Sequence, residues 1–253
     1  MDSLDKALFD YHNTDKTIAT ILEETKLSKS YFYRHLDYKE KFREKKKART
    51  YTFNIEKFKI DSSDKYYWLG FIAADGAIIN NTLSIELNSI DKEHLKLFND
   101  FFENTKDIEE RINNLNNLNV KCAKVQINSY ELVEYLKNYN LVQNKSLTYT
   151  IPEDKIPKNY MMDFIRGIID GDGCIRINNH QQISLSFCGG NETCVRQVRD
   201  LLGIDNKIKI DNKTYSFQVT GNIKAKNILD KIYANSTEKN RLERKYSIYK
   251  TLC

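Results

Sequence analysis

The chain has 253 residues and a mass of 29.8 kDa, a length that suits one large domain together with a small one. Hydrophobic residues make up 40% and charged residues 30%, and there are only 2 prolines, so the composition excludes a low-complexity or linker-like chain. The net charge of +5 is too small to identify a partner by itself.

The sequence shows no feature of a membrane or secreted protein. No apolar run approaches the roughly 20 residues that cross a bilayer. The first residues, Met1 to Asp5, lack the positive charge of a signal peptide, so we expect a cytoplasmic protein without a membrane partner. The five cysteines form no Cys-x-x-Cys pair, and we expect free thiols rather than a zinc site.

Residues 1–45 are predicted to form a small helical module. Thr14 or Asp15 can cap a first helix, and Ser28 can cap a second one. Phe32 and Leu36 lie four residues apart and should pack inward, which leaves an outward face made of Lys29, Tyr31 and Arg34. The pattern resembles a helix-turn-helix, whose second helix enters the major groove of DNA. A plain helical hairpin is the alternative, because Lys26 occupies the turn where a glycine is common.

Residues 46–65 are predicted to be a charged connector. The segment from Lys39 to Arg49 carries seven basic residues against Glu40 and Glu44. It is either a solvated helix face or, beside a DNA-binding module, a segment that follows DNA phosphates. The short stretch 51–55 has the composition of a strand.

The rest of the chain repeats one order of elements, in residues 66–150 and again in residues 151–253. Each copy reads as a helix, a strand pair, a second helix, a second strand pair and a closing helix, and a basic helix over 240–250 ends the chain. We therefore predict an α+β fold, a pseudo-twofold pair of αββαββα units with a small N-terminal helical module added to it.

The predicted strands alternate between apolar and polar residues, so each should have one core face and one exposed face. Ile208 and Ile210, for example, should face the core. The exposed face is rich in the amide, hydroxyl and ammonium groups that read base edges in the major groove of DNA. Its members are Ser84, Glu86, Asn88, Lys124, Gln126 and Asn128 in the first copy, and Gln182, Ser184, Ser186, Lys207, Lys209 and Gln218 in the second.

The helix that opens each copy carries small residues four positions apart. The stretches are WLGFIAADG, with Gly70 and Ala74, and IRGIIDGDG, with Gly167 and Gly171. Small residues at this spacing make a flat stripe along a helix, and two such stripes allow two helices to touch backbone to backbone. The duplicated spacing predicts that the two helices pack against each other.

Each of these helices ends on an aspartate, Asp75 in the first and Asp172 in the second. The glycines that follow, Gly76 and Gly173, are predicted to be left-handed C-terminal caps. A carboxylate at a helix C-terminus opposes the helix dipole, and close packing would add repulsion between the two charges. A divalent cation between the carboxylates would relieve both penalties, and oxygen ligands next to a DNA phosphate suit Mg²⁺.

The two stretches resemble the signature motif of the LAGLIDADG homing endonucleases, present here in two copies about a hundred residues apart. The resemblance implies a single-chain, monomeric endonuclease whose saddle-shaped antiparallel sheet binds double-stranded DNA at a long asymmetric target. It implies hydrolysis that leaves a 5′-phosphate, with Mg²⁺, or Mn²⁺ as a substitute, held by Asp75 and Asp172 beside Ala74 and Gly171. The sixth motif position differs between the copies, Ala73 against Asp170, so Asp170 is not expected to be a ligand.

The family also places basic side chains near the metal ions. Lys145 and Lys245 stand at similar places in the two copies and are our candidates for catalytic lysines. Lys124, Lys207 and Lys155 remain open as alternatives, and each of the five could instead be an ordinary surface lysine.

Two other functions stay open. A DNA-binding transcriptional regulator that does not cut could use the same fold, although the presence of both motif aspartates argues against it. An RNA maturase that assists the splicing of an intron could use the same surface, so RNA is not excluded as a partner.

Overall fold

The computed structural model describes residues 2–14, 16–36, 51–115 and 118–251. The chain divides into two compact units, Met1–Thr50 and Tyr51–Cys253, and each has a hydrophobic core of its own. The basic segment from Lys39 to Arg49 lies outside the described residues. Within the described ranges, no helix combines the length and the apolar character that crossing a membrane requires.

Among its described residues, the smaller unit contains the helices α1 (Ser3–Asn13), α2 (Ile18–Thr25) and α3 (Lys29–His35). The cap of α3 is confirmed, because the Ser28 hydroxyl accepts a hydrogen bond from the backbone N–H of Tyr31 at 3.3 Å. The predicted cap of the preceding helix was wrong: α2 begins after Thr17, whose hydroxyl accepts from the N–H of Thr20. Helix α1 was not predicted.

The second and third helices join at Lys26, which has a φ of 56° in the left-handed region that favours glycine. Phe32 and Leu36 are buried in the small core, as predicted. The three outward residues of α3 are exposed, with Tyr31 at 42%. The helix-turn-helix interpretation itself stays a prediction.

Residues 51–65 belong to the larger unit rather than to a connector. The stretch 51–54 forms no strand, but its backbone pairs with the end of a later helix, through Asn54 N–H to Phe102 O and Thr105 N–H to Thr52 O. A short 3-10 helix η1 (Ile55–Phe58) follows, and its Phe58 is fully buried. These contacts explain the difference from the sequence prediction, because Phe53, Ile55 and Phe58 of this charged segment pack in or against the core of the larger unit.

The predicted order of elements in both copies is confirmed. The first copy contains α6 (Ser63–Asp75), β1 (Gly76–Ile79), β2 (Thr82–Asn88), α7 (Lys92–Phe102), β3 (Glu109–Leu115), β4 (Leu118–Asn128) and α8 (Tyr130–Lys137). The second contains α9 (Met161–Asp172), β5 (Gly173–Ile177), β6 (Ile183–Gly189), α10 (Glu192–Leu201), β7 (Lys209–Asp211), β8 (Thr214–Thr220), α11 (Asn222–Tyr233) and the additional α12 (Glu243–Lys250).

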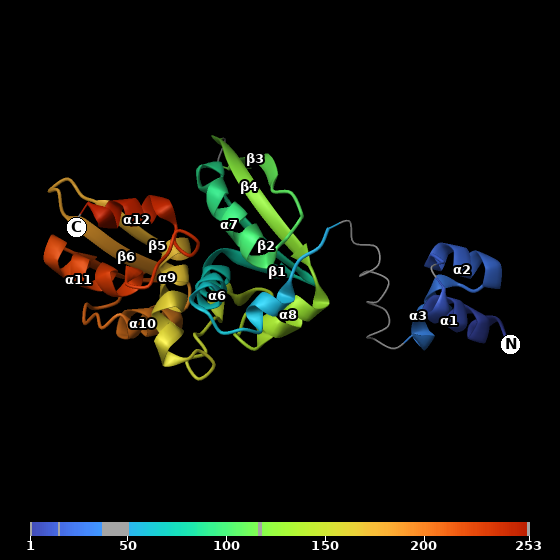
Figure 1. The fold of residues 1–253 in the computed structure, drawn as a ribbon. Coiled ribbons are helices and arrows are strands. Elements are labelled where there is room, and N and C mark those ends of the chain that lie inside the picture. Colours follow the sequence, from blue (N-terminus) through green and yellow to red (C-terminus); the bar gives the residue numbers. More distant parts are fainter. Residues whose placement is uncertain (1, 15, 37–50, 116–117, 252–253) are drawn as a thin grey trace. The chain divides into compact units, whose positions relative to one another are not determined.

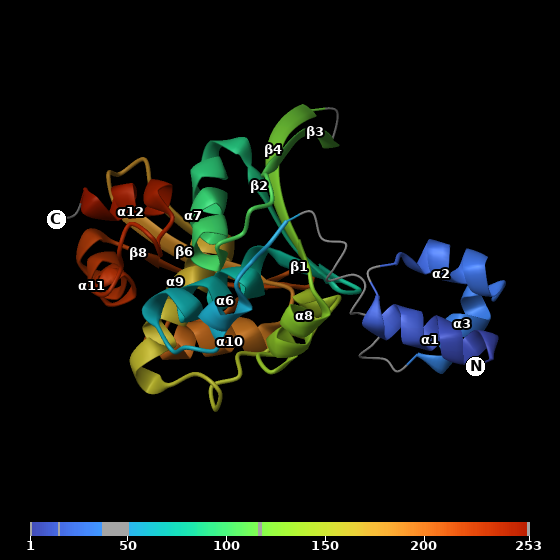
Figure 2. The same ribbon diagram turned by 45° about the vertical axis from the view of Figure 1, so that its right-hand side comes forward.

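Each copy has its own antiparallel four-stranded sheet, and the strand order is the same in both, β1-β2-β4-β3 and β5-β6-β8-β7. Helices α7 and α8 pack on the first sheet, and α10 and α11 pack on the second. The opening helices α6 and α9 lie side by side between the two copies (Figures 1 and 2). The pseudo-twofold α+β fold expected from the sequence is therefore present.

The polar residues predicted for the open face of each sheet are neighbours across the strands. Ser84 lies opposite Gln126 and Glu86 opposite Lys124, while in the second sheet Ser186 lies opposite Gln218. Directly opposite residues of an antiparallel pair project from the same face, so this register gathers the predicted side chains on one face of each sheet.

Three details of that face differ from the prediction. Ser184 is only 1% exposed, because the Gln218 amide donates to its hydroxyl at 2.8 Å and covers it. Lys207 precedes the short strand β7 rather than lying in it. Ile210 is 67% exposed instead of facing the core, because β7 is a three-residue edge strand that extends beyond the hydrophobic layer.

Candidate active site

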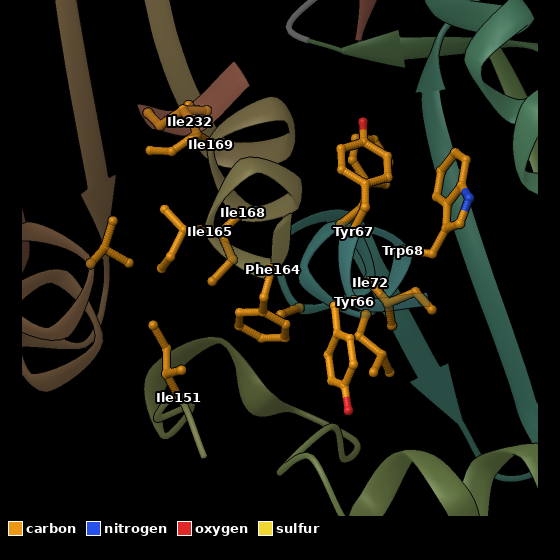
Figure 3. Close-up of a cluster of buried hydrophobic side chains, with 14 of the residues drawn as sticks. Tyr66, Tyr67, Trp68, Ile72, Ile151, Phe164, Ile165, Ile168, Ile169 and Ile232 are labelled. Atoms are coloured by element: carbon orange, nitrogen blue, oxygen red, sulfur yellow. The ribbon is translucent and has the colours of Figure 1, made fainter. Parts of the chain in front are cut away.

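Helices α6 and α9 meet backbone to backbone through their glycines. A Cβ atom added to Gly70 would lie 2.0 Å from the carbonyl oxygen of Phe164, and one added to Gly167 would lie 2.1 Å from that of Tyr67. Larger side chains point away from the contact toward the core of their own copy: Figure 3 shows Trp68 turned away from α9 and Ile165 turned away from α6.

The close contact continues to the C-terminal ends of both helices. A Cβ added to Gly171 would lie 2.4 Å from the Cβ of Ala74 and 3.1 Å from a carboxylate oxygen of Asp75. Asp75 and Asp172, which end the two helices, are thereby brought to one place. This proximity is the geometric requirement for a cation shared between them.

The predicted left-handed caps were wrong. Gly76 and Gly173 have φ values of −74° and −76°, and each leads directly into a strand. Glycine is required there for space, because an added Cβ would lie 2.5 Å from the carbonyl oxygen of Ile72 in the first copy and 2.6 Å from that of Ile169 in the second.

The environment opposes the negative charge of both carboxylates. Burial raises the pKa of Asp75 to about 6, and the neighbouring charge of Asp172 adds to the effect. Burial also raises the pKa of Asp172, against the opposing attraction of Lys145 and Lys245. Two carboxylates whose ionisation is unfavourable in the protein alone are well suited to a cation that compensates both charges.

Lys145 and Lys245 both lie at the ends of the paired helices. Lys145, in the 3-10 helix η3 (Lys145–Leu147), donates to the carbonyl oxygen of Ala74 at 3.4 Å. Lys245, in α12, donates to the last carbonyl oxygens of α9, including Asp170 at 2.7 Å and Gly171 at 3.1 Å. Burial lowers the pKa of both lysines, while the nearby aspartates act in the opposite direction.

The alternative lysines lie elsewhere. Lys155 is exposed and pairs with Asp154 at 3.3 Å, and Lys124 lies opposite Glu86 in the first sheet. The lysine charges that act on Asp75 and Asp172 come from Lys145 and Lys245.

Asp170, which the sequence did not favour as a ligand, is buried and hydrogen-bonded within the protein. Its fully buried carboxylate accepts hydrogen bonds from the hydroxyls of Tyr67 and Tyr233 and from the backbone N–H of Leu242 at 2.7 Å. Leu242 immediately precedes α12, so these bonds help to hold the helix that carries Lys245. Ala73 occupies the corresponding position of the first copy, and its methyl side chain cannot form such hydrogen bonds.

The protein supplies only some of the ligands that a hard cation such as Mg²⁺ needs. No group of three or more His, Cys, Asp or Glu side chains that could hold a metal ion occurs among the described residues. Mg²⁺ commonly binds through one or two carboxylates and completes its shell with water and substrate phosphate oxygens, so two aspartates are sufficient. The carbonyl oxygens of Ala74 and Gly171 accept hydrogen bonds from the lysines, but each has a second lone pair.

The raised pKa of Asp75 leads to a prediction about stability. A carboxyl group with a folded-state pKa of about 6, against 3.8 when exposed, stabilises the fold fully below pH 3.8 and loses that contribution as the pH rises through 6. Without metal at pH 8, Asp75→Asn removes the free-energy cost of the buried charge, which is about 1–2 kcal/mol after allowance for solvent screening. The substitution should therefore raise Tm by roughly 2–8 °C.

Thermal unfolding in EDTA at pH 8 and at pH 4 checks this expectation. The gain should be absent at pH 4, and Asp107→Asn, at an exposed aspartate outside the site, should change Tm at neither pH. A lower Tm for Asp75→Asn at pH 8 would contradict the proposed charge penalty.

Sequence reasoning missed several polar residues near the predicted ones. Arg111 on β3 forms an ion pair with Glu86, and Arg176 on β5 lies opposite Ser184. Both extend the polar face of their sheet. The alternation of residues along each strand could have identified them, because each arginine projects from the same face of its sheet as the polar residues of the neighbouring strand.

Comparison with known proteins agrees with this arrangement. A family model described as a LAGLIDADG-like domain matches residues 159–233, which run from the 3-10 helix η4 (Lys158–Tyr160) to the end of α11. Residues 159–233 are therefore similar to a LAGLIDADG-like domain. No curated protein matches the chain in sequence.

Solved structures extend the LAGLIDADG likeness beyond the second copy. The homing endonuclease I-WcaI, bound to its DNA recognition sequence, aligns with a TM-score of 0.52 at 14% identity, over 83% of this chain and 94% of its own. The LAGLIDADG homing endonuclease I-LtrWI, bound to target DNA, gives 0.51 at 14% identity, over 75% and 89%. The meganuclease I-SmaMI, bound to uncleaveable DNA, gives 0.50 at 13% identity, over 74% and 88%. At these identities the likeness establishes the LAGLIDADG fold, as the sequence predicted.

Proposed function

We propose that this chain is a site-specific endonuclease that hydrolyses both strands of duplex DNA at a long asymmetric target. One observation carries the proposal: two carboxylates, Asp75 and Asp172, end two helices that touch, and the buried lysines Lys145 and Lys245 flank them. Burial makes the charges of this group unfavourable in the protein alone. A bound cation and a DNA phosphate would compensate them.

The aspartates and the lysines have separate roles in the proposed reaction. Asp75 and Asp172 would hold Mg²⁺, or Mn²⁺ in its place, and the metal would polarise the scissile phosphate and activate water for in-line attack. The ammonium groups of Lys145 and Lys245 place positive charge beside the same point, where negative charge grows on the phosphate in the transition state. Their bonds to helix carbonyl oxygens keep them in position before the substrate binds.

The polar faces of the two sheets supply the DNA-binding surface of this proposal. They carry amide, hydroxyl and basic groups in cross-strand register, and Arg111 and Arg176 add guanidinium groups at their edges. Such side chains match the donor and acceptor pattern of base edges in the major groove. The DNA-bound states of the two homing endonucleases and the meganuclease with this fold support the same assignment.

A cleavage selection tests the function directly. The purified protein is incubated with a library of randomised duplex DNA in Mg²⁺ or in EDTA, and the ends produced are sequenced. We expect paired cuts within one long sequence in Mg²⁺ only. Enrichment of a bound sequence without cut ends would favour the DNA-binding regulator, and cutting in EDTA would contradict the metal site.

Removal of the smaller unit provides a separate prediction. If residues 1–50 bind DNA through Lys29, Tyr31 and Arg34, the 51–253 protein should bind the selected target more weakly and with a flatter salt dependence. Each DNA phosphate that the shorter protein no longer neutralises should reduce the slope of log K against log salt by about one. Cutting should persist at high protein concentration, because both aspartates remain.

Binding measured at several salt concentrations, for the full chain and for residues 51–253, checks the role of the smaller unit. A matched variant, Lys29→Ala with Arg34→Ala in the full chain, separates the exposed face of α3 from the rest of the deleted segment. Equal affinity and equal slope for all three proteins would show that the smaller unit does not bind DNA.

A further inference from the structure

Lys245 uses its whole ammonium group to bind the backbone at the end of α9. Its Nζ lies 2.9 Å from the carbonyl oxygen of Ile169 and 2.7 Å from that of Asp170. It also donates to the carbonyl oxygen of Gly171 at 3.1 Å and to that of Gly173. An ammonium group has three protons, so these four acceptors occupy all of them. Lys245 therefore has no donor left for a DNA phosphate.

The same bonds fix the backbone on both sides of Asp172. Gly171 directly precedes this aspartate in α9, and Gly173 follows it as the first residue of β5. A helix leaves its last carbonyl oxygens without partners of its own, and a positive charge at that end is favourable. Lys245 thus caps the C-terminus of α9 and holds the residue that carries a candidate metal ligand.

Helix α12, which carries Lys245, is itself attached to both copies. The backbone N–H of Leu242, just before the helix, donates to the buried carboxylate of Asp170 at 2.7 Å. Arg244 donates to both carboxylate oxygens of Asp91 in the first copy, at 3.1 Å and 2.9 Å. The protein therefore determines the position of Lys245 before metal or DNA binds.

Lys145 is bound much less completely at the end of α6. Among the residues that the structure describes, its ammonium group makes one hydrogen bond, to the carbonyl oxygen of Ala74 at 3.4 Å. Two of its three protons remain for other acceptors. Lys145 is 6% exposed, and a buried ammonium group with few partners would bind a phosphate oxygen favourably.

We infer that the two lysines have different roles. Lys145 is the catalytic residue of the pair and donates to the phosphate that is cut. Lys245 is a positioning residue: it acts through Asp172, whose backbone it fixes, and its own contribution to the phosphate is limited to charge at a distance. The inference rests on the proposed nuclease function and separates two lysines that occupy similar places in the two copies.

Thermal unfolding in EDTA, without DNA, tests the role of Lys245 as a cap. Lys245→Met leaves four carbonyl oxygens without their donor, so Tm should fall by roughly 5–10 °C. Lys145→Met removes a buried charge that makes one long hydrogen bond, so it should not lower Tm. Lys250→Met, the same change at an exposed position of α12, is the control and should leave Tm unchanged.

Single-turnover cutting of the selected target, measured over a range of Mg²⁺ concentrations, tests the division of roles. Lys145→Met should slow the cutting of at least one strand about a hundredfold at every Mg²⁺ concentration, the usual effect of losing one donor to the transition state. Lys245→Met should need roughly tenfold more Mg²⁺ for half-maximal cutting and approach the wild-type rate when Mg²⁺ saturates, because a loosened Asp172 binds the ion more weakly. A lysine with a structural role alone would lower Tm without changing the Mg²⁺ requirement.

Lys245→Arg keeps the test decisive if the methionine variant does not fold. A planar guanidinium binds phosphate well but cannot bring its protons to four converging carbonyl oxygens, so we again expect a lower Tm and a higher Mg²⁺ requirement. Wild-type Tm and cutting in Lys245→Arg, or wild-type cutting in Lys145→Met, would overturn the inference and leave the nuclease function intact. A wild-type protein that binds DNA but cuts neither strand would overturn the nuclease function and, with it, the catalytic role of Lys145.

Discussion

Replacing Gly167 by alanine is expected to destabilise the larger unit strongly. The added Cβ would lie 2.1 Å from the carbonyl oxygen of Tyr67 and 2.6 Å from the backbone nitrogen of Phe71. Both atoms belong to the backbone of α6, so no side-chain rotation can relieve the clash. The two helices must separate, and overpacking of this kind costs about 1–3 kcal/mol or more.

Thermal and denaturant unfolding of Gly167→Ala measures the effect, and Gly70→Ala should behave alike, because its Cβ would lie 2.0 Å from the Phe164 carbonyl oxygen. Gly189→Ala is the control: its added Cβ would meet only a Val195 methyl group at 3.2 Å, which can move. Wild-type stability of both Gly167→Ala and Gly70→Ala would mean that the helices do not pack through these glycines.

The second large effect concerns chemistry rather than stability. Asp75→Asn and Asp172→Asn should each reduce double-strand cutting by a thousandfold or more, corresponding to roughly 4 kcal/mol, because the amide keeps the shape and loses the charge that holds a cation. Target affinity should remain within a few-fold of wild type, since the sheet faces that carry the DNA-binding side chains are unchanged.

Cleavage and binding of the selected target are measured in parallel for both variants. Asp107→Asn, at an exposed aspartate outside the site, should cut at the wild-type rate. Retained cutting by either motif variant would remove that aspartate from the metal site, and a loss of binding in parallel with cutting would point to a general structural defect.

The sequence predicted the architecture because the signal is repeated. Two motif helices with small residues at Gly70 and Gly167, each followed by the same run of alternating strands, determine the order of elements and the helix contact together. A single copy would have left Gly167 open to interpretation as a turn residue.

Local errors arose where tertiary context overrides a local pattern. An aspartate followed by glycine at a helix end is typical of a left-handed cap, but Gly76 and Gly173 enter their strands with extended backbone and are glycines because the carbonyl oxygens of Ile72 and Ile169 leave no room. Ile210 follows the alternating pattern of a buried strand, and the sequence does not show where the core layer ends.

The candidate site could be predicted only in part for a similar reason. The aspartates follow from the motif itself, whereas Lys145 reaches the Ala74 carbonyl oxygen across 71 residues and Lys245 reaches Gly171 across 74. Local periodicity carries no information about such distances, so the sequence left five lysines open.

The claim that Asp75 and Asp172 hold the catalytic metal can be tested most directly by diffraction. Crystals of the protein with its selected target DNA are grown in Mn²⁺, and the anomalous signal of manganese locates the ions. We expect anomalous peaks within about 2.0–2.3 Å of carboxylate oxygens of Asp75 and Asp172 and beside the scissile phosphates, and no such peaks in the doubly substituted Asp75→Asn, Asp172→Asn protein. Manganese bound elsewhere, or DNA bound between intact aspartates that hold no ion, would contradict it.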